Sequence, residues 1–228
     1  MPIAAPPPAF DGFSPGAFAF YAELEEPGNN SKTWFDANRD RYQREVRAPL
    51  EALLQAAADE FGTHAKVFRA HRDVRFSEDK RPYKTNAAAL ITVDGIVDAP
   101  GFYVSLDADG LAVGVGYAAF SRDQLRRYRE AVDDDRSGSE LAALVEAART
   151  AGFSLGGRTL VRGPRGTAPD HPRLDLLCHT TMTLLRAYPY DEALTMPAAA
   201  ELVFGTWRDG TPIARWLTRH LTGGATRG

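Results

Sequence analysis

Apolar residues recur at steps of three and four between residues 34 and 61, which predicts a helix with one side facing the core. Pro49 lies inside this stretch, so we expect the helix to kink or to split there. An earlier helix is predicted to begin at Ser14-Pro15, where a capping residue precedes a proline at the first helical position. The Asn29-Asn30 pair is the candidate cap of the helix that follows.

After Gly62 the pattern changes to short apolar segments, which are typical of strands. The turn residues Asp94-Gly95 and Asp109-Gly110 separate three of these segments, as in β-hairpins. We predict strands over residues 87–93, 102–106, 111–115, 153–161 and 176–185.

Start signals predict the later helices. Capping boxes at Ser121–Gln124 and Ser137–Glu140 should each open a helix. Pro197 and Thr211-Pro212 are expected to start two separate terminal helices.

The order of these elements predicts an α+β fold. Helices flank runs of hairpin-type strands, so we expect a single domain with a mainly antiparallel sheet and helices at both chain ends and in the middle. We place this domain at residues 10–222. A disordered tail is predicted over residues 1–9, which are rich in proline, and a flexible tail over residues 223–228.

The composition is that of a soluble globular protein, with 44% apolar and 25% charged residues among 228. No apolar run reaches the roughly 18 residues of a membrane-spanning helix. The first residues lack the basic and apolar stretches of a signal peptide, and the single cysteine, Cys178, excludes an intramolecular disulfide. These features predict a cytoplasmic protein.

The net charge of −3 is unevenly distributed. Residues 66–86 hold seven lysines or arginines and three acidic residues, so this segment carries +4 and the rest of the chain −7. A basic segment in an acidic chain predicts an anion-facing surface. Nucleic acid is not the expected partner, because the chain shows no nucleic-acid-binding motif and no broad basic field.

The segment Arg72–Thr85 has few apolar residues, so packing alone does not account for it. Arginine grips a phosphate or carboxylate through two N–H groups, lysine acts as a point charge, and serine and tyrosine add hydroxyl donors. We therefore predict a pocket for a small anionic or phosphorylated ligand, helped by the basic loop Arg162–His171. For an enzyme, Asp73 or Asp79 is the candidate base. The predicted ligand contacts are Arg72, Arg75, Ser77, Lys80, Tyr83, Lys84, Arg165 and His171.

The same charges fit a second interpretation. Arg72 with Asp73 or Asp79, and Arg75 with Asp79 or Glu78, would form a buried salt-bridge network that fixes the fold without any ligand. The protein would then be a non-enzymatic interaction module with a protein or nucleic-acid partner. The sequence predicts neither a reaction nor an oligomeric state.

No cofactor or metal site is predicted. Gly114-x-Gly116 lacks the third glycine of a dinucleotide site, and we expect a close approach of two backbones there instead. The histidines have no metal-binding spacing. Cys178 and His179 are adjacent on a predicted strand, so their side chains should diverge and Cys178 should be a structural residue.

Four motifs carry a resemblance to a known family: Asn29–Phe35, Arg72–Thr85, Gly114–Tyr117 and Pro164–Pro172. In this order they resemble the bacterial and fungal family catalogued as domain of unknown function 2461, over most of the chain from about residue 10 to residue 221. The resemblance implies no activity, cofactor or catalytic residue. Similar sequences often carry an aromatic residue near position 167, a basic residue near 178 and a lysine near 180, and this chain departs from that pattern.

Overall fold

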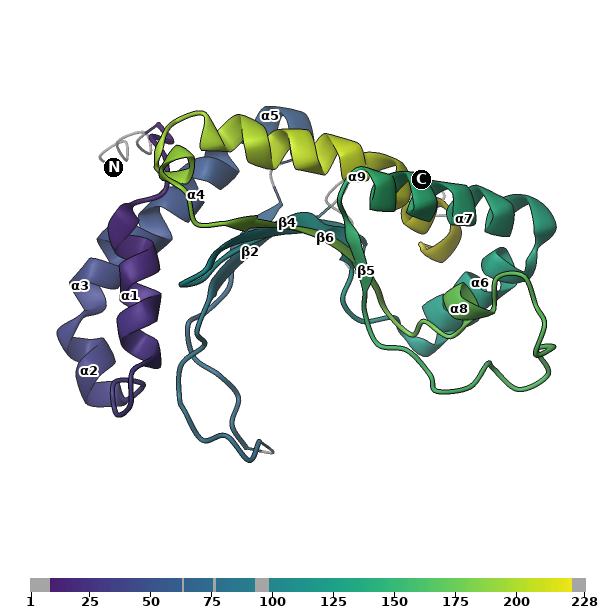
Figure 1. Ribbon diagram of the computed structural model, residues 1–228, viewed down its shortest axis with the longest axis horizontal. Helices are drawn as coiled ribbons and strands as arrows, with labels where there is room; N and C mark the ends of the chain where they lie inside the picture. The colour runs from purple at the N-terminus through teal and green to yellow at the C-terminus, as the bar shows by residue number, and fades with distance from the viewer. Residues whose placement is uncertain (1–8, 63, 76, 93–98, 223–228) are drawn as a thin grey trace, which may run out of the picture. The chain divides into compact units, whose positions relative to one another are not determined.

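The computed structural model describes residues 9–62, 64–75, 77–92 and 99–222. Within them, six strands form one antiparallel sheet in the order β1-β2-β3-β4-β6-β5 (Figure 1). The strands are β1 (Ala65–Val67), β2 (Ala87–Thr92), β3 (Gly101–Leu106), β4 (Gly110–Tyr117), β5 (Ser154–Gly156) and β6 (Met182–Pro189). The expected α+β class with an antiparallel sheet is confirmed.

Contacts divide the chain into two compact units, which we describe separately. The described residues of the first unit fall within 1–91, 103–112 and 187–205, and those of the second within 92–102, 113–186 and 206–228. Residues 1–8 of the tail predicted at 1–9, the tail at 223–228 and the turn at Asp94-Gly95 lie outside the described residues.

Helices of the first unit follow one another from residue 15 to residue 61. They are α1 (Pro15–Glu25), α2 (Lys32–Ala37), α3 (Arg39–Arg41), the π-helix η1 (Tyr42–Arg47), α4 (Ala48–Ala56) and α5 (Ala58–Phe61), and the 3₁₀ turn η3 (Glu192–Thr195) comes later. Ser14 caps α1 as predicted, because its side chain accepts the Gly16 N–H at 3.1 Å. Arg41 joins α3 to α1 through an ion pair with Glu23 at 2.6 Å.

The cap of α2 differs from the prediction. Ser31, and neither asparagine before it, accepts the Trp34 N–H. Asn29 instead donates its side-chain amide to the Glu23 carbonyl at 2.8 Å, which closes the end of α1. Asn30 has a partner far along the chain, described below.

Pro49 is accommodated by a change of helix type. The chain stays helical through this residue, and the turn just before it, η1, is a π-helix. Proline has no N–H to donate and its ring crowds the carbonyl four residues earlier, so a widened turn at this place relieves both problems. Tyr42 and Val46 of this turn remain buried, and Tyr42 packs against Phe20 and Phe35.

Helices of the second unit include α6 (Arg122–Asp133), α7 (Asp135–Thr150) and α8 (Leu174–Leu177). The capping box at Ser121 and Gln124 is confirmed, with both reciprocal hydrogen bonds present. The predicted box at Ser137 is wrong: α7 begins three residues earlier, capped by Asp134, whose carboxylate accepts the N–H groups of Arg136 and Ser137. Both residues are good caps, and the earlier one starts the helix.

Three predictions for the later part of the chain are also corrected. The two terminal helices predicted to start at Pro197 and at Thr211-Pro212 are one helix, α9 (Ala199–Leu221), which continues through Pro212. The Thr211 hydroxyl donates to the Trp207 carbonyl at 2.9 Å within this helix. The strand predicted over residues 176–185 begins only at Met182, because Leu176 and Leu177 belong to α8. The strand predicted over residues 153–161 is shorter than expected and consists of β5, Ser154–Gly156. No described helix is long and apolar enough to cross a membrane.

Glycines 114 and 116 lie where the backbones of β4 and β6 approach closely, as predicted. A Cβ on Gly114 would lie 1.9 Å from the Leu184 carbonyl oxygen, and one on Gly116 would lie 2.3 Å from that of Met182. Only glycine fits at such positions.

Candidate functional site

The basic motif forms the outer part of a long β-hairpin in the first unit. Pairing of β1 with β2 continues outward, with Phe68 N–H donating to the Ala88 carbonyl at 2.8 Å and Arg72 N–H donating to that of Pro82 at 2.8 Å. We call residues 68–88 the motif hairpin. Figure 1 shows it leaving the end of β2 as an extended loop.

Asn30 holds the motif hairpin to the helices. Its side-chain amide donates to the Tyr83 carbonyl at 3.1 Å, and its oxygen accepts the Tyr83 N–H at 3.0 Å. The Tyr83 ring stacks on Phe35, with centroids 3.9 Å apart and planes 5° from parallel. Tyr83 is buried, and this burial raises the pKa of its hydroxyl. Two of the four sequence motifs therefore meet at Tyr83.

Ion pairs span the tip of the motif hairpin. Arg72 contacts Asp79 at 2.5 Å, and Arg81 contacts the same carboxylate at 2.8 Å. Arg75 grips Asp73 through two N–H groups, at 2.6 and 2.9 Å. The predicted Arg72–Asp79 pair is present, but Arg75 pairs with Asp73 and neither Asp79 nor Glu78.

These pairs are not the buried network that the sequence suggested as an alternative. Side-chain exposure is 77% for Arg75 and 46% for Asp73, and about a third for Arg72 and Asp79. Exposed pairs are screened by water and contribute little to stability. We therefore expect these charges to contribute little to the stability of the fold.

The two candidate bases are held in their ionised form. Hydrogen bonds from Arg75 lower the pKa of Asp73, and hydrogen bonds from Arg81 and then Arg72 lower the pKa of Asp79 strongly. A carboxylate that prefers ionisation this much is a weak proton acceptor at neutral pH. Neither geometry nor pKa adds support for a catalytic role of these residues.

An open depression of about 290 Å³ lies on the motif hairpin. Three predicted ligand contacts, Arg72, Tyr83 and Lys84, line it; Ser77 lies 3.5 Å from the Arg72 guanidinium and lines no part of it. Arg75 and Lys80 do not line it either. Arg75 pairs with Asp73, and Lys80 donates to the Val74 carbonyl at 3.2 Å. The full lining is Arg72, Asp79, Arg81, Tyr83, Lys84, Thr85 and Asn86.

Sequence reasoning missed Arg81, Thr85 and Asn86 as lining residues. Alternation of side chains along an extended segment would place Arg81, Tyr83 and Thr85 on one face, but Lys84 and Asn86 on the other face line the depression too, so no simple sequence signal identified them. Lys84 is the cation of the depression with no carboxylate partner among the described residues. Its ammonium lies 5.4 Å from the centre of the Phe68 ring, and that of Lys66 lies 5.7 Å from the same ring.

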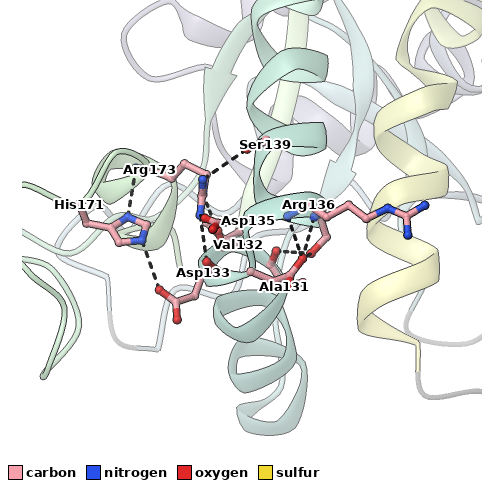
Figure 2. A network of polar contacts seen from close by, with 10 residues as sticks. Ala131, Val132, Asp133, Asp135, Arg136, Ser139, His171 and Arg173 are labelled. Carbon is pink, nitrogen blue, oxygen red and sulfur yellow. Dashed lines mark hydrogen bonds and ion pairs between the residues drawn. The ribbon is translucent and has the colours of Figure 1, made fainter.

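The other two predicted contacts, Arg165 and His171, belong to the second unit. His171 is part of the polar network in Figure 2. Its Nδ1 accepts the Arg173 N–H at 3.1 Å, and its Nε2 lies 3.2 Å from an Asp133 carboxylate oxygen. Both ring nitrogens are thus occupied by the protein itself.

Arg173 is the centre of this network. Its guanidinium donates to the carbonyls of Val132 at 2.7 Å and Asp133 at 2.9 Å, and contacts the Asp135 carboxylate at 3.1 Å (Figure 2). Only 7% of Arg173 is exposed. The structure uses this arginine to hold the junction of α6 and α7.

Cys178 and His179 do not lie on a regular strand as predicted. Cys178 is the half-buried C-terminal cap of α8, and His179 is buried beside it. The Nδ1 of His179 lies 3.2 Å from the Thr181 carbonyl oxygen, so we assign the proton to this nitrogen. Burial lowers the pKa of His179.

This shift predicts an acid-sensitive fold. In the unfolded chain the histidine is protonated near its ordinary pKa of about 6.5, whereas in the folded chain it is protonated only at lower pH. Between these two pKa values the unfolded state binds more protons than the folded state. The free energy of unfolding therefore falls as the pH falls through this range. Urea unfolding between about pH 7.5 and 5.5 should show a shallower decline for His179→Gln than for the unmodified protein. Burial lowers the pKa of His220 as well. The free energy of unfolding of a variant with both His179→Gln and His220→Gln should therefore decline least. Equal slopes for all three proteins would contradict this prediction.

The chain was compared with known protein families and with curated proteins. A family model described as "Conserved hypothetical protein (DUF2461)" matches residues 16–216, a range that contains all four sequence motifs. A search of curated proteins finds no match. Among the described residues, no group of three or more His, Cys, Asp or Glu side chains is placed to hold a metal ion.

Proposed function

We propose that this chain, which belongs to the DUF2461 family of conserved hypothetical proteins, binds a small anionic ligand in the depression on the motif hairpin. The observation that carries the proposal is the charge of the lining. Three cations, Arg72, Arg81 and Lys84, face one carboxylate, that of Asp79. The lining is therefore positively charged and an anion is its natural complement.

The donors around the depression suit a carboxylate or phosphate. Arg72 and Arg81 share Asp79, and each guanidinium has five N–H donors, more than this one carboxylate uses. Lys84 supplies an ammonium, and Thr85 and Asn86 add a hydroxyl and an amide. Hydrogen bonds between such cations and an anion are stronger than those between neutral groups.

The proposal is one of binding and includes no reaction. Arg75, Ser77 and Lys80 stay predicted contacts that would require the tip of the hairpin to rearrange around a ligand. Arg165 and His171 stay predictions as well. A non-enzymatic interaction module, with a protein or nucleic acid bound at the same charges, is the alternative that the experiment must separate.

Amide chemical shifts offer a direct test at low ionic strength. Inorganic phosphate, succinate and a nucleoside monophosphate should each be titrated while the amides of residues 84–86 are followed by NMR. We expect saturable shifts for at least one anion, and a Kd at least about tenfold weaker in Lys84→Gln, equivalent to the loss of one charge-assisted contact. Lys32→Gln is the matched control, because Lys32 is an exposed lysine of α2 that does not line the depression.

The outcomes separate the interpretations. Phosphate and succinate arms distinguish a phosphorylated from a carboxylated ligand. No saturable shift with any anion, or equal weakening by Lys32→Gln, would overturn the proposal. Binding of an oligonucleotide that is far tighter than these anions and falls steeply with salt would favour the nucleic-acid module instead.

A further inference from the structure

Strand β1 is an edge of the sheet. It pairs with β2 on one side, in the register Ala65–Ile91, Lys66–Leu90 and Val67–Ala89, and stands at the end of the strand order. Edge strands leave a row of backbone N–H and C=O groups available to another chain.

The hydrogen-bond pattern shows which backbone groups face outward. Phe68 donates to the Ala88 carbonyl, so residues 66 and 68 are the ones that bond to β2 in this antiparallel pair. Ala65 and Val67 therefore direct their N–H and C=O groups to the outer edge. These groups are the hydrogen-bonding sites that a further strand would use.

An open groove of about 490 Å³ lies beside this edge. The groove is lined by Arg47 of η1, by Glu51, Leu54 and Gln55 of α4, by Ala58 of α5, and by Ala65, Lys66 and Val67 of β1. Arg47 pairs with Glu51 at 2.8 Å. A strand added to β1 would thus have side chains on one face in contact with a partly apolar wall.

The two faces of β1 differ in chemistry. Ala65 and Val67 lie on the face of Ile91 and Ala89, both fully buried. Lys66 lies on the opposite face with Leu90, and its ammonium and that of Lys84 lie near the Phe68 ring. No carboxylate pairs with Lys66 among the described residues. An added strand would therefore need apolar residues on one face and acidic residues on the other.

We propose that the β1 edge binds an extended peptide segment of a partner protein in which apolar and acidic residues alternate. Strand addition of this kind takes affinity from backbone hydrogen bonds and specificity from alternate side chains. Charge argues against a second copy of this chain. Antiparallel pairing of two β1 strands through Ala65 and Val67 places Lys66 opposite Lys66, and directly opposed like charges are destabilising.

Peptide binding tests this proposal. The probe is a fluorescein-labelled octapeptide that alternates valine and glutamate, followed by fluorescence anisotropy against the full chain. We expect saturable binding, no binding of an octapeptide that alternates valine and lysine, and weaker binding of an isomer with its valines and glutamates in two blocks. Lys66→Glu should weaken binding at least about tenfold. Lys32→Glu, at an exposed lysine in α2, is the matched control.

Ala65→Pro tests the contribution of backbone hydrogen bonds at the β1 edge separately from that of the Lys66 charge. Proline removes an N–H that β2 does not use, so the fold should persist while strand addition fails, and we expect at least about a tenfold weaker Kd. Circular dichroism confirms that the variant is folded; if it is not, the same peptide with N-methylated valines replaces it in the test. Equal affinity of the alternating and blocked peptides, or an unchanged Kd in Lys66→Glu, would overturn the proposal. So would a concentration-dependent dimer that Ala65→Pro abolishes.

Two variants separate this outcome from the anion site, although both ammonium groups lie near the Phe68 ring: Lys84→Gln should weaken phosphate binding, and Lys66→Glu should weaken peptide binding. Phosphate titration reports on Lys84, Thr85 and Asn86, whereas the peptide reports on Ala65–Val67. One site can therefore fail while the other stands.

Discussion

Arg173→Ala is expected to lower the free energy of unfolding by about 3 kcal/mol, because it removes a hydrogen bond to a buried carbonyl and a second one to a partly buried carbonyl. The guanidinium bonds to the Val132 and Asp133 carbonyls, at the end of α6. Helix ends leave such carbonyls without partners in the helix itself. The ion pair with Asp135 adds little, since that carboxylate is exposed.

Equilibrium unfolding in urea measures this effect. Arg158→Ala is the control, because Arg158 is an exposed arginine that bonds to Thr180 and Thr181 through its backbone; its loss should stay within about 0.5 kcal/mol. Arg173→Lys should recover only part of the loss, since an ammonium lacks the planar fork that reaches two carbonyls at once. A loss below about 1 kcal/mol for Arg173→Ala would mean that the α6–α7 junction holds without this residue.

Gly114→Ala is expected to have an effect of similar size, about 3 kcal/mol, through overpacking. The added Cβ would lie 1.9 Å from the Leu184 carbonyl oxygen, which belongs to the backbone of β6 and cannot rotate away as a side chain would. Pairing of β4 with β6 must therefore open locally. Thermal unfolding should show a clearly lower midpoint.

Gly205→Ala provides the opposite control. Gly205 lies in α9 with no atom within 4 Å of its added Cβ. Alanine is the better helix former by about 1 kcal/mol, so this variant should be more stable. If both glycine variants lost stability equally, the close approach of β4 and β6 would not be the cause.

The sequence predicted what local patterns determine. Ser14 and Ser121 cap helices within three residues of themselves, and the α+β class follows from the order of helical and strand patterns. The start of α7 was missed because Asp134 and Ser137 are both good caps, three residues apart. The continuity of α9 through Pro212 was missed because proline is a strong local stop signal that packing of the whole helix outweighed.

Long-range partners account for the remaining differences. Asn30 is a residue type that often caps helices, but its partner Tyr83 is 53 residues away. Arg173 resembles the surface arginines around it, but its carbonyl partners are about 40 residues earlier. For the candidate site, the basic segment can be recognised in the sequence, but which of its side chains line the depression depends on how the hairpin twists and pairs.

The π-helix η1 has a consequence for how chain length can vary within the family. A π turn holds one residue more than an α turn, so deleting one residue from Tyr42–Arg47 would restore a regular α-helix with its flanking faces in phase. Elsewhere in this helix a single deletion would rotate all later residues by about 100° around the axis. Leu50 and Leu53, both fully buried, would then leave the core. We expect relatives that differ by one residue here to differ within positions 42–47.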